Sequence, residues 1–390
     1  MLFLLGTGII IKQIFNSYDY QLGDMFSSSL ELLGIVGLMM IVLEAAVELD
    51  LNKKKYKIIR KSLLLAFLVL VISSVAIGSA IMYFLKEPFF NSLIYAIPVS
   101  VVSSAVLIPS LHTLSEEKKE FLVYESTFSD IIGIMFFNFV VISNAEIFTA
   151  SGFMMILLTL VSSLVLSYIM VYVFSRINSK IKIFLIISIL ALLFALGKQL
   201  HLSSLLMIFI FGIVLNNAKR VFIGPLARLL PKEGMKPIIK DFHIITAETA
   251  FVVRTFFFVA FGMIIDLNQL FQTEVLIVGS SIVLILYIIR YLNFKIFTHT
   301  DVFPEIFLAP RGLITILLFF QIPEDKVIAE FGVGVLFFVI LATGIIMMIA
   351  LMTNKSENLE NFTVLEFGFN PTSESSENDA SGKFSEYDDL

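Results

Sequence analysis

The stretch Glu125-Ser126-Thr127-Phe128-Ser129-Asp130 places two carboxylates inside an apolar segment that runs roughly from residue 121 to residue 142. A charged side chain at the centre of a membrane-spanning helix costs about 2.5–3.5 kcal/mol. Residues four apart lie on the same side of a helix, so the two carboxyl and two seryl groups form one polar stripe. The stretch predicts either a carboxylate fixed in a structural ion pair or a titratable ion site at membrane depth, and the cost of burial favours the second.

The composition around this stretch is typical of a polytopic membrane protein. Of the 390 residues, 58% are hydrophobic and 15% are charged, whereas soluble domains contain about 25% charged residues. The absence of cysteine excludes disulfides and cysteine-based metal sites, and we expect neither a cofactor nor a nucleic-acid partner. The net charge of −5 arises from residues 353–390, which we expect to form a disordered acidic cytoplasmic tail.

Apolar segments long enough, or nearly so, to cross a bilayer recur along the chain. They lie near residues 1–16, 29–48, 62–85, 90–112, 120–143, 151–175, 181–198, 202–217, 239–265, 272–292, 302–321 and 327–352. The predicted fold class is an all-α polytopic membrane protein with about 12 transmembrane helices. The first segment is short, so it is either a partial span or follows a helix that this sequence lacks. Its flanks do not resemble a signal peptide.

Basic residues gather in every second connection between these segments. The even-numbered connections contain the lysines and arginines of 53–61, 118–119, 176–182 and 218–240, together with Lys295. The odd-numbered connections contain only Lys86, Lys198 and Lys326. By the positive-inside rule, we expect both termini in the cytoplasm and an even number of spans.

Two segments contain residues that helices in lipid avoid. Pro98 precedes Ser103 and Ser104 in the fourth segment, and Pro304 precedes Pro310-Arg311-Gly312 in the eleventh. Interrupted helices at corresponding positions of two halves indicate a transporter binding site. The pattern predicts inverted five-helix repeats with two broken crossing helices, in which Ser103 and Ser104 line the unwound part. Simple proline kinks are the alternative.

The ionisable residues expected at membrane depth comprise one more acid than base: Glu44, Glu125, Asp130, Glu248, Arg254, Arg290 and Arg311. If each arginine takes one acid, one carboxylate is left over. Burial disfavours its charged form, so it can hold either a proton near neutral pH or a small cation. We predict that Asp130 is this carboxylate, with Ser126 and Ser129 as further oxygen ligands of a monovalent cation. Glu125 is predicted to pair with Arg290.

These residues resemble the monovalent cation:proton antiporter superfamily, on the side of the sodium/proton exchangers. Glu125-Ser126-x-x-Ser129-Asp130 is similar to the family's Glu-Ser-x-x-Asn-Asp ion-binding helix, and Leu43 to Leu51 is similar to its second helix, where Glu44 would face the ion path. Arg311-Gly312 resembles the family's second broken helix, and Arg254 to Gly262 its phenylalanine-rich segment. Arg290 stands where the family has a basic partner for the first glutamate. The resemblance implies that Arg290 and Arg311 both compensate negative charge in the core.

The resemblance covers residues 1–352 and implies a homodimer in the bacterial inner (plasma) membrane. It also implies a core, roughly 62–143 and 272–352, that moves as an elevator against scaffold helices, roughly 1–48 and 151–265. Ser129 departs from the family, which often has asparagine there. Val102-Ser103-Ser104-Ala105 stands where exchangers often have Ala-Thr-Asp-Pro. Both departures bear on ion choice and affinity.

The sequence therefore predicts a secondary antiporter and not an enzyme. It would exchange Na⁺, or alternatively K⁺ or Li⁺, for H⁺ across a lipid bilayer, and the single free carboxylate predicts electroneutral exchange. An uncoupled cation channel on the same helices is one alternative, and it would conduct cations without proton counterflow. A membrane sensor that does not transport is another, and Asp130 would then be dispensable.

Overall fold

The computed structural model describes residues 1–18, 24–48, 55–143, 182–199, 204–217, 235–298, 303–328 and 330–353, with 154, 157–158, 161–169 and 172. The segment expected at 151–175 lies largely outside the described residues, and so do most of the basic connection at 218–238 and the tail after residue 353. Every regular element in the described ranges is a helix. This confirms the all-α class.

The helices of the first half are α1 (Leu2–Ser17), α2 (Asp24–Glu48), α3 (Tyr56–Leu85), α4 (Phe89–Ser100), α5 (Ser104–Leu107), η2 (Ile108–Thr113) and α6 (Glu116–Ser143). Those of the second half are α8 (Lys182–Gln199), α9 (Ser204–Asn216), α11 (Met235–Ile264), η4 (Leu267–Phe271), α12 (Thr273–Thr298), α13 (Leu313–Phe319), η5 (Glu324–Lys326) and α14 (Val333–Thr353). Within the described chain, 5 helices are long and apolar enough to cross a membrane, and α1, α8, α9 and the second part of α2 are shorter apolar helices.

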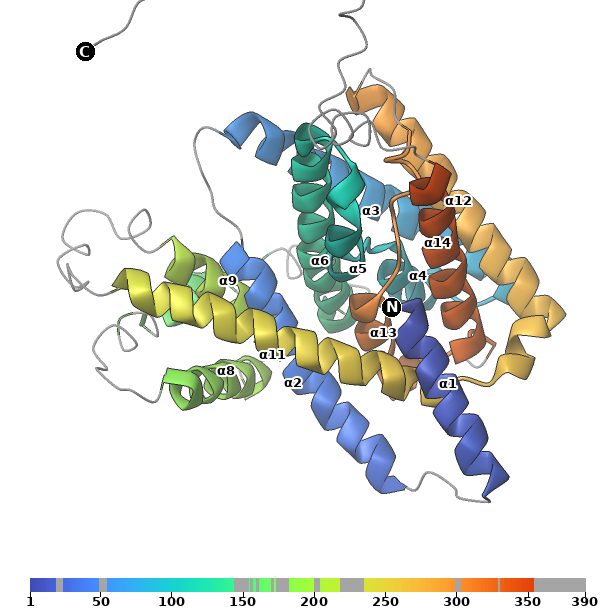
Figure 1. The fold of residues 1–390 in the computed structure, drawn as a ribbon, viewed down its shortest axis with the longest axis horizontal. Coiled ribbons are helices and arrows are strands. Elements are labelled where there is room, and N and C mark those ends of the chain that lie inside the picture. Colours follow the sequence, from blue (N-terminus) through green and yellow to red (C-terminus); the bar gives the residue numbers. More distant parts are fainter. Residues whose placement is uncertain are drawn as a thin grey trace, which may run out of the picture.

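The helices form two groups that lie side by side (Figure 1). In one group, α3 packs on α4, α6 and α12, and α12 packs on α14. In the other, α2 packs on α9 and α11, α11 on α1, and α8 on α9. Because α2 also contacts α6, the polar stripe of α6 lies near the boundary between the two groups.

Helices α1 and α11 approach each other closely because two glycines meet between them. A Cβ atom at Gly8 would lie 2.1 Å from the carbonyl oxygen of Val259, and one at Gly262 would lie 2.4 Å from that of Leu5. Only hydrogen fits in such a contact, as in other close helix pairs of membrane proteins. Lys12 Nζ also donates to the carbonyl oxygen of Ile265 at 2.7 Å and thereby satisfies the end of α11.

Both predicted helix breaks are present. Helix α4 ends at Ser100, and extended backbone leads to α5, which begins at Ser104. Residues 308–312 are not helical and lead into α13. The two unwound stretches are joined where Ser103 N donates to the carbonyl oxygen of Pro310 at 2.9 Å. Buried protein surrounds this irregular backbone, which is the condition under which membranes tolerate it.

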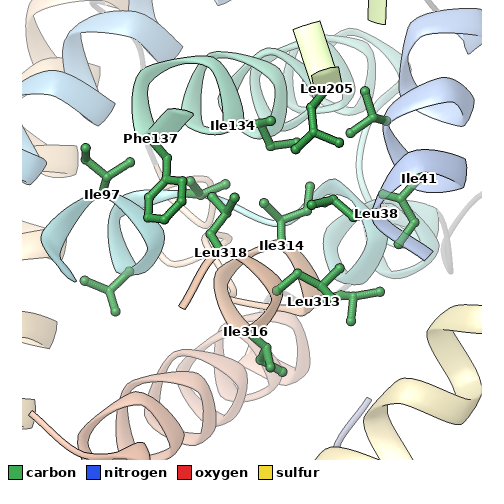
Figure 2. Packing of buried hydrophobic residues seen from close by; sticks show 14 of the residues in the cluster. Leu38, Ile41, Ile97, Ile134, Phe137, Leu205, Leu313, Ile314, Ile316 and Leu318 are labelled. Atoms are coloured by element: carbon green, nitrogen blue, oxygen red, sulfur yellow. The ribbon is translucent and has the colours of Figure 1, made fainter. Parts of the chain in front are cut away.

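Helix α13 packs against both groups. Figure 2 shows Leu313 and Ile314 of α13 near Ile41 of α2, and Leu318 near Phe137 of α6. All of these side chains belong to the main apolar cluster. The short helix next to the second break therefore carries apolar contacts across the boundary between the groups.

Candidate functional site

Asp130 lies in the middle of α6, beside the start of α5, and is 1% exposed. Its Oδ2 accepts a hydrogen bond from Ser104 N at 3.1 Å and a second, short one from the Ser104 hydroxyl. The first N–H groups of a helix have no partner within the helix, which explains why Ser104 N is free to donate. The other oxygen, Oδ1, is buried and has no hydrogen-bond partner among the described residues.

A small cavity adjoins Asp130. Its volume is about 10 Å³, which is room for about one water molecule. The rest of its lining is apolar and comes from both helix groups: Ile41, Val42, Ala45, Ile131, Ile134, Met135, Leu205, Leu206, Phe209 and Ile314. In this conformation a cation could reach Asp130 only after losing most of its hydration shell.

Glu125, at the other end of the polar stripe, is neutralised by Arg290 of α12. Arg290 Nη1 and Nη2 donate to the two carboxylate oxygens at 2.7 and 3.0 Å, and both side chains are at most 2% exposed. The same guanidinium donates to the carbonyl oxygens of Glu305 and Leu308 and lies 4.5 Å from the centre of the Phe294 ring. The predicted contact between Glu125 and Arg290 is thus confirmed.

Glu44 of α2 and Arg254 of α11 form a second ion pair, in the other helix group. Arg254 Nη2 donates to both carboxylate oxygens, at 3.1 and 2.8 Å. The two side chains are 16% and 18% exposed. The sequence placed both residues at membrane depth but did not pair them with each other.

Arg311 corrects the expectation that each arginine takes one acid. Its guanidinium donates to carbonyl oxygens at the end of α4, to Val99 at 2.8 Å and to Ser100 at 3.3 Å, and to Ala309. The break after Ser100 leaves the last carbonyls of α4 without partners in the helix, and they also carry its negative dipole end. Glu248, which was expected to supply a further paired acid, is exposed on α11.

The hydroxyl groups of Ser126 and Ser129 are hydrogen-bonded to the backbone and not to Asp130. Ser126 Oγ donates to the carbonyl oxygen of Leu122 at 2.8 Å. Ser129 Oγ accepts from Val102 N at 2.9 Å and so fixes the unwound stretch to α6. Cation ligation by these two serines stays a prediction. Ser104, which the sequence placed only as a lining residue together with Ser103, is the direct partner of Asp130.

Replacing Ser104 by alanine should therefore weaken cation binding without abolishing it. The hydroxyl donates to the ionised carboxylate of Asp130, so its loss favours the protonated form and strengthens the proton as competitor. We expect the pH profile of transport to move to higher pH by about one to two units, which corresponds to one hydrogen bond to a charged group. Ser104→Thr, which keeps a hydroxyl, should behave like the wild type. An unchanged profile in Ser104→Ala would exclude this role.

Comparison with known families supplies the class of protein. The family described as "Sodium/hydrogen exchanger, transmembrane" matches residues 1–353. The chain belongs to this family. No curated protein matches this exchanger by sequence.

Among solved structures, this exchanger is similar to the sodium proton antiporter MjNhaP1 from Methanocaldococcus jannaschii, determined at pH 8. The TM-score is 0.66 at 17% sequence identity, over 93% of this chain and 91% of that chain. The match confirms the antiporter fold predicted from the interrupted segments. The protein is thus a membrane transporter of the cation/proton antiport class, and not an enzyme.

Proposed function

We propose that this exchanger carries a monovalent cation, Na⁺ in the first place and K⁺ or Li⁺ as alternatives, in exchange for H⁺ at Asp130. The observation that carries the proposal is a difference between Asp130 and two other acids, Glu44 and Glu125. Glu44 and Glu125 are each paired with an arginine. Among the described residues, the Asp130 carboxylate accepts hydrogen bonds only from Ser104, and one of its oxygens has no hydrogen bond. A buried carboxylate of this kind needs a proton or a cation to offset its charge.

The coupling between cation and proton transport would follow from the cost of burying an uncompensated charge. With the site open to the cytoplasm, Asp130 releases its proton and binds the cation, and the core then carries the cation across the membrane. A proton returns from the other side. A bare carboxylate should not cross readily, because its charge would then be left without hydration or a counter-ion. The core would comprise roughly 62–143 and 272–352, moving against a scaffold of 1–48 and 151–265 within a homodimer.

The packing and the charges support this movement. The contacts within each helix group are more extensive than those between the groups, and the boundary beside Asp130 is mostly apolar. Movement of the core against the scaffold would therefore break few polar contacts. The distribution of Lys and Arg supports cytoplasmic termini. The membrane proposed for this exchanger is the bacterial inner (plasma) membrane.

The proposal is tested with purified protein in proteoliposomes that carry an internal pH indicator. Pulses of Na⁺, K⁺ and Li⁺ are applied against an outward or inward pH gradient. Cation-dependent dissipation of the gradient for at least one ion, with saturation in that ion, is the expected result. Cation flux without proton counterflow would instead identify a channel, and the absence of any flux would favour a sensor.

Exchange is also expected to be electroneutral. Glu44 and Glu125 are neutralised by arginines, and the buried Glu305 pairs with Lys118. Asp130 is therefore the one buried carboxylate of the described residues that remains to exchange one proton for one cation. The rate of Na⁺-driven proton movement should not change when the membrane potential is clamped at different values by K⁺ and valinomycin at fixed ΔpH. A clear dependence of the rate on voltage would require a second titrating group, and the stoichiometry proposed would be wrong.

A further inference from the structure

The Glu44–Arg254 pair belongs to the helix group opposite Asp130 but lies next to its cavity. Ile41 and Ala45 of α2, one turn before Glu44 and one residue after it, both line that cavity. Arg254 of α11 is bound to Glu44, and α11 packs on α2. A charge pair of the proposed scaffold thus stands beside the carboxylate of the proposed core.

The two members of this pair act on Asp130 with opposite sign. Glu44 lies between two α2 residues that line the Asp130 cavity, and Arg254 is bound to Glu44, so both charges act on the Asp130 carboxylate. Glu125, the nearest acid on α6 itself, is neutralised by Arg290. The positive charge of Arg254 favours the ionised form of Asp130, whereas the negative charge of Glu44 opposes it. As long as the pair is intact, the two effects largely cancel.

Arg254 also retains a donor that the pair does not use. Nη2 takes both contacts with Glu44, and Nε is buried without a hydrogen-bond partner in the described part of the chain. Asp130 Oδ1 is the corresponding acceptor, and it too has no hydrogen-bond partner among the described residues. A buried guanidinium N–H and a buried carboxylate oxygen that both lack a partner are expected to gain much from meeting.

We propose that Arg254 is a positioning residue of the exchange cycle. When Asp130 is ionised and holds no cation, the Arg254 guanidinium binds it in place of the cation, and Glu44 restrains Arg254 by binding the same guanidinium. The inference rests on the function proposed above. Because α11 lies in the scaffold, an arginine that holds the empty carboxylate also holds the core in place. The core is released when Na⁺ or H⁺ replaces the arginine. Glu44 sets the strength of this hold by competing for the same guanidinium.

Charge-removing variants separate this role from a purely structural one, because they should shift transport in opposite directions. In Glu44→Gln, the unrestrained Arg254 repels the cation and favours ionised Asp130. We expect the KM for Na⁺ to rise about tenfold and the pH profile to move to lower pH by about one unit. In Arg254→Gln, the KM for Na⁺ should fall and the profile should move to higher pH. The double variant should return to within about twofold of the wild type, since a neutral pair again faces Asp130.

The experiment measures Na⁺-driven proton movement at several pH values in proteoliposomes, with detergent melting curves for each variant. Arg254→Lys, which keeps the charge, should stay near the wild type and guards against loss of fold in Arg254→Gln. Glu248→Gln removes an exposed carboxylate from the same helix and should move neither KM nor pH profile. Shifts in the same direction for both single variants, or a double variant that does not recover, would overturn the role of Arg254.

Asp130→Asn distinguishes the failure of this inference from that of the proposed function. If Asp130→Asn still exchanges Na⁺ for H⁺, the carrier is another group and the proposed function fails. If Asp130→Asn is inactive, and if Glu44→Gln and Arg254→Gln shift the KM for Na⁺ and the pH profile in the same direction, Asp130 remains the carrier and only the role of Arg254 is refuted.

Discussion

Asp130→Asn will insert and fold but will not exchange cations for protons. The amide is nearly isosteric with the carboxyl group and can keep its contact with Ser104, but it neither releases a proton near neutral pH nor supplies a negative charge to a cation. Removal of a buried charge that has no basic partner among the described residues should also leave the protein at least as stable as the wild type. Dissipation of ΔpH in proteoliposomes and a melting curve in detergent measure the two effects.

Asp266→Asn is the matched control for this variant. Asp266 is an exposed aspartate before η4, where its carboxylate accepts a hydrogen bond from Asn268 N at 3.0 Å, and asparagine can retain that bond. Transport by Asp266→Asn should equal that of the wild type. Transport by Asp130→Asn at the wild-type rate would remove Asp130 from the mechanism.

The second large effect is expected on stability, from the pair Glu125–Arg290. Both side chains are buried in apolar surroundings, so removal of one partner leaves the other as an uncompensated charge, at a cost of about 3–5 kcal/mol in the free energy of unfolding. Glu125→Gln and Arg290→Met should therefore each destabilise the protein strongly. The double variant should recover much of the loss, because no buried charge remains unpaired.

A double-mutant cycle from melting curves in detergent measures this coupling. We expect a coupling energy well above the roughly 0.5 kcal/mol of independent sites. The exposed pair Glu116–Lys119 at the start of α6, with side chains 88% and 36% exposed, is the control, and it should couple by at most about 1 kcal/mol. Strict additivity at Glu125 and Arg290 would mean that the pair does not hold α6 to α12, and Glu125 would then be available as a proton carrier.

Much of the fold could be read from the sequence because a bilayer restricts what a chain can do. Apolar runs must be helices where they cross lipid, so most helix positions followed from hydropathy. Proline and glycine marked the two breaks, at Pro98 and at Pro310-Arg311-Gly312. The contact between Glu125 and Arg290 was also predictable, since each needs a partner of opposite charge at membrane depth.

The remaining details depend on how helices are rotated and on which backbone groups a break exposes. Arg311 donates hydrogen bonds to carbonyl oxygens of α4 and does not pair with an acid. Those carbonyls can accept these bonds only because α4 ends at Ser100. Ser104 and not Ser126 or Ser129 donates to Asp130, because the first turn of α5 is aimed at that carboxylate. Neither fact follows from spacing along one helix, although a serine directly after a break is a signal for such a contact.

The most direct measurement of the central claim is proton release when Na⁺ binds to the purified exchanger in detergent, in weakly buffered solution with a pH indicator. Competition for one carboxylate predicts the release of about one proton per bound Na⁺ near neutral pH, as for other cation sites whose ligands must lose protons. The release should be absent in Asp130→Asn and should vanish at high pH, where the carboxylate is already ionised. Proton release by Asp130→Asn equal to that of the wild type, or saturable Na⁺ binding to the wild type without any proton release near neutral pH, would contradict the account.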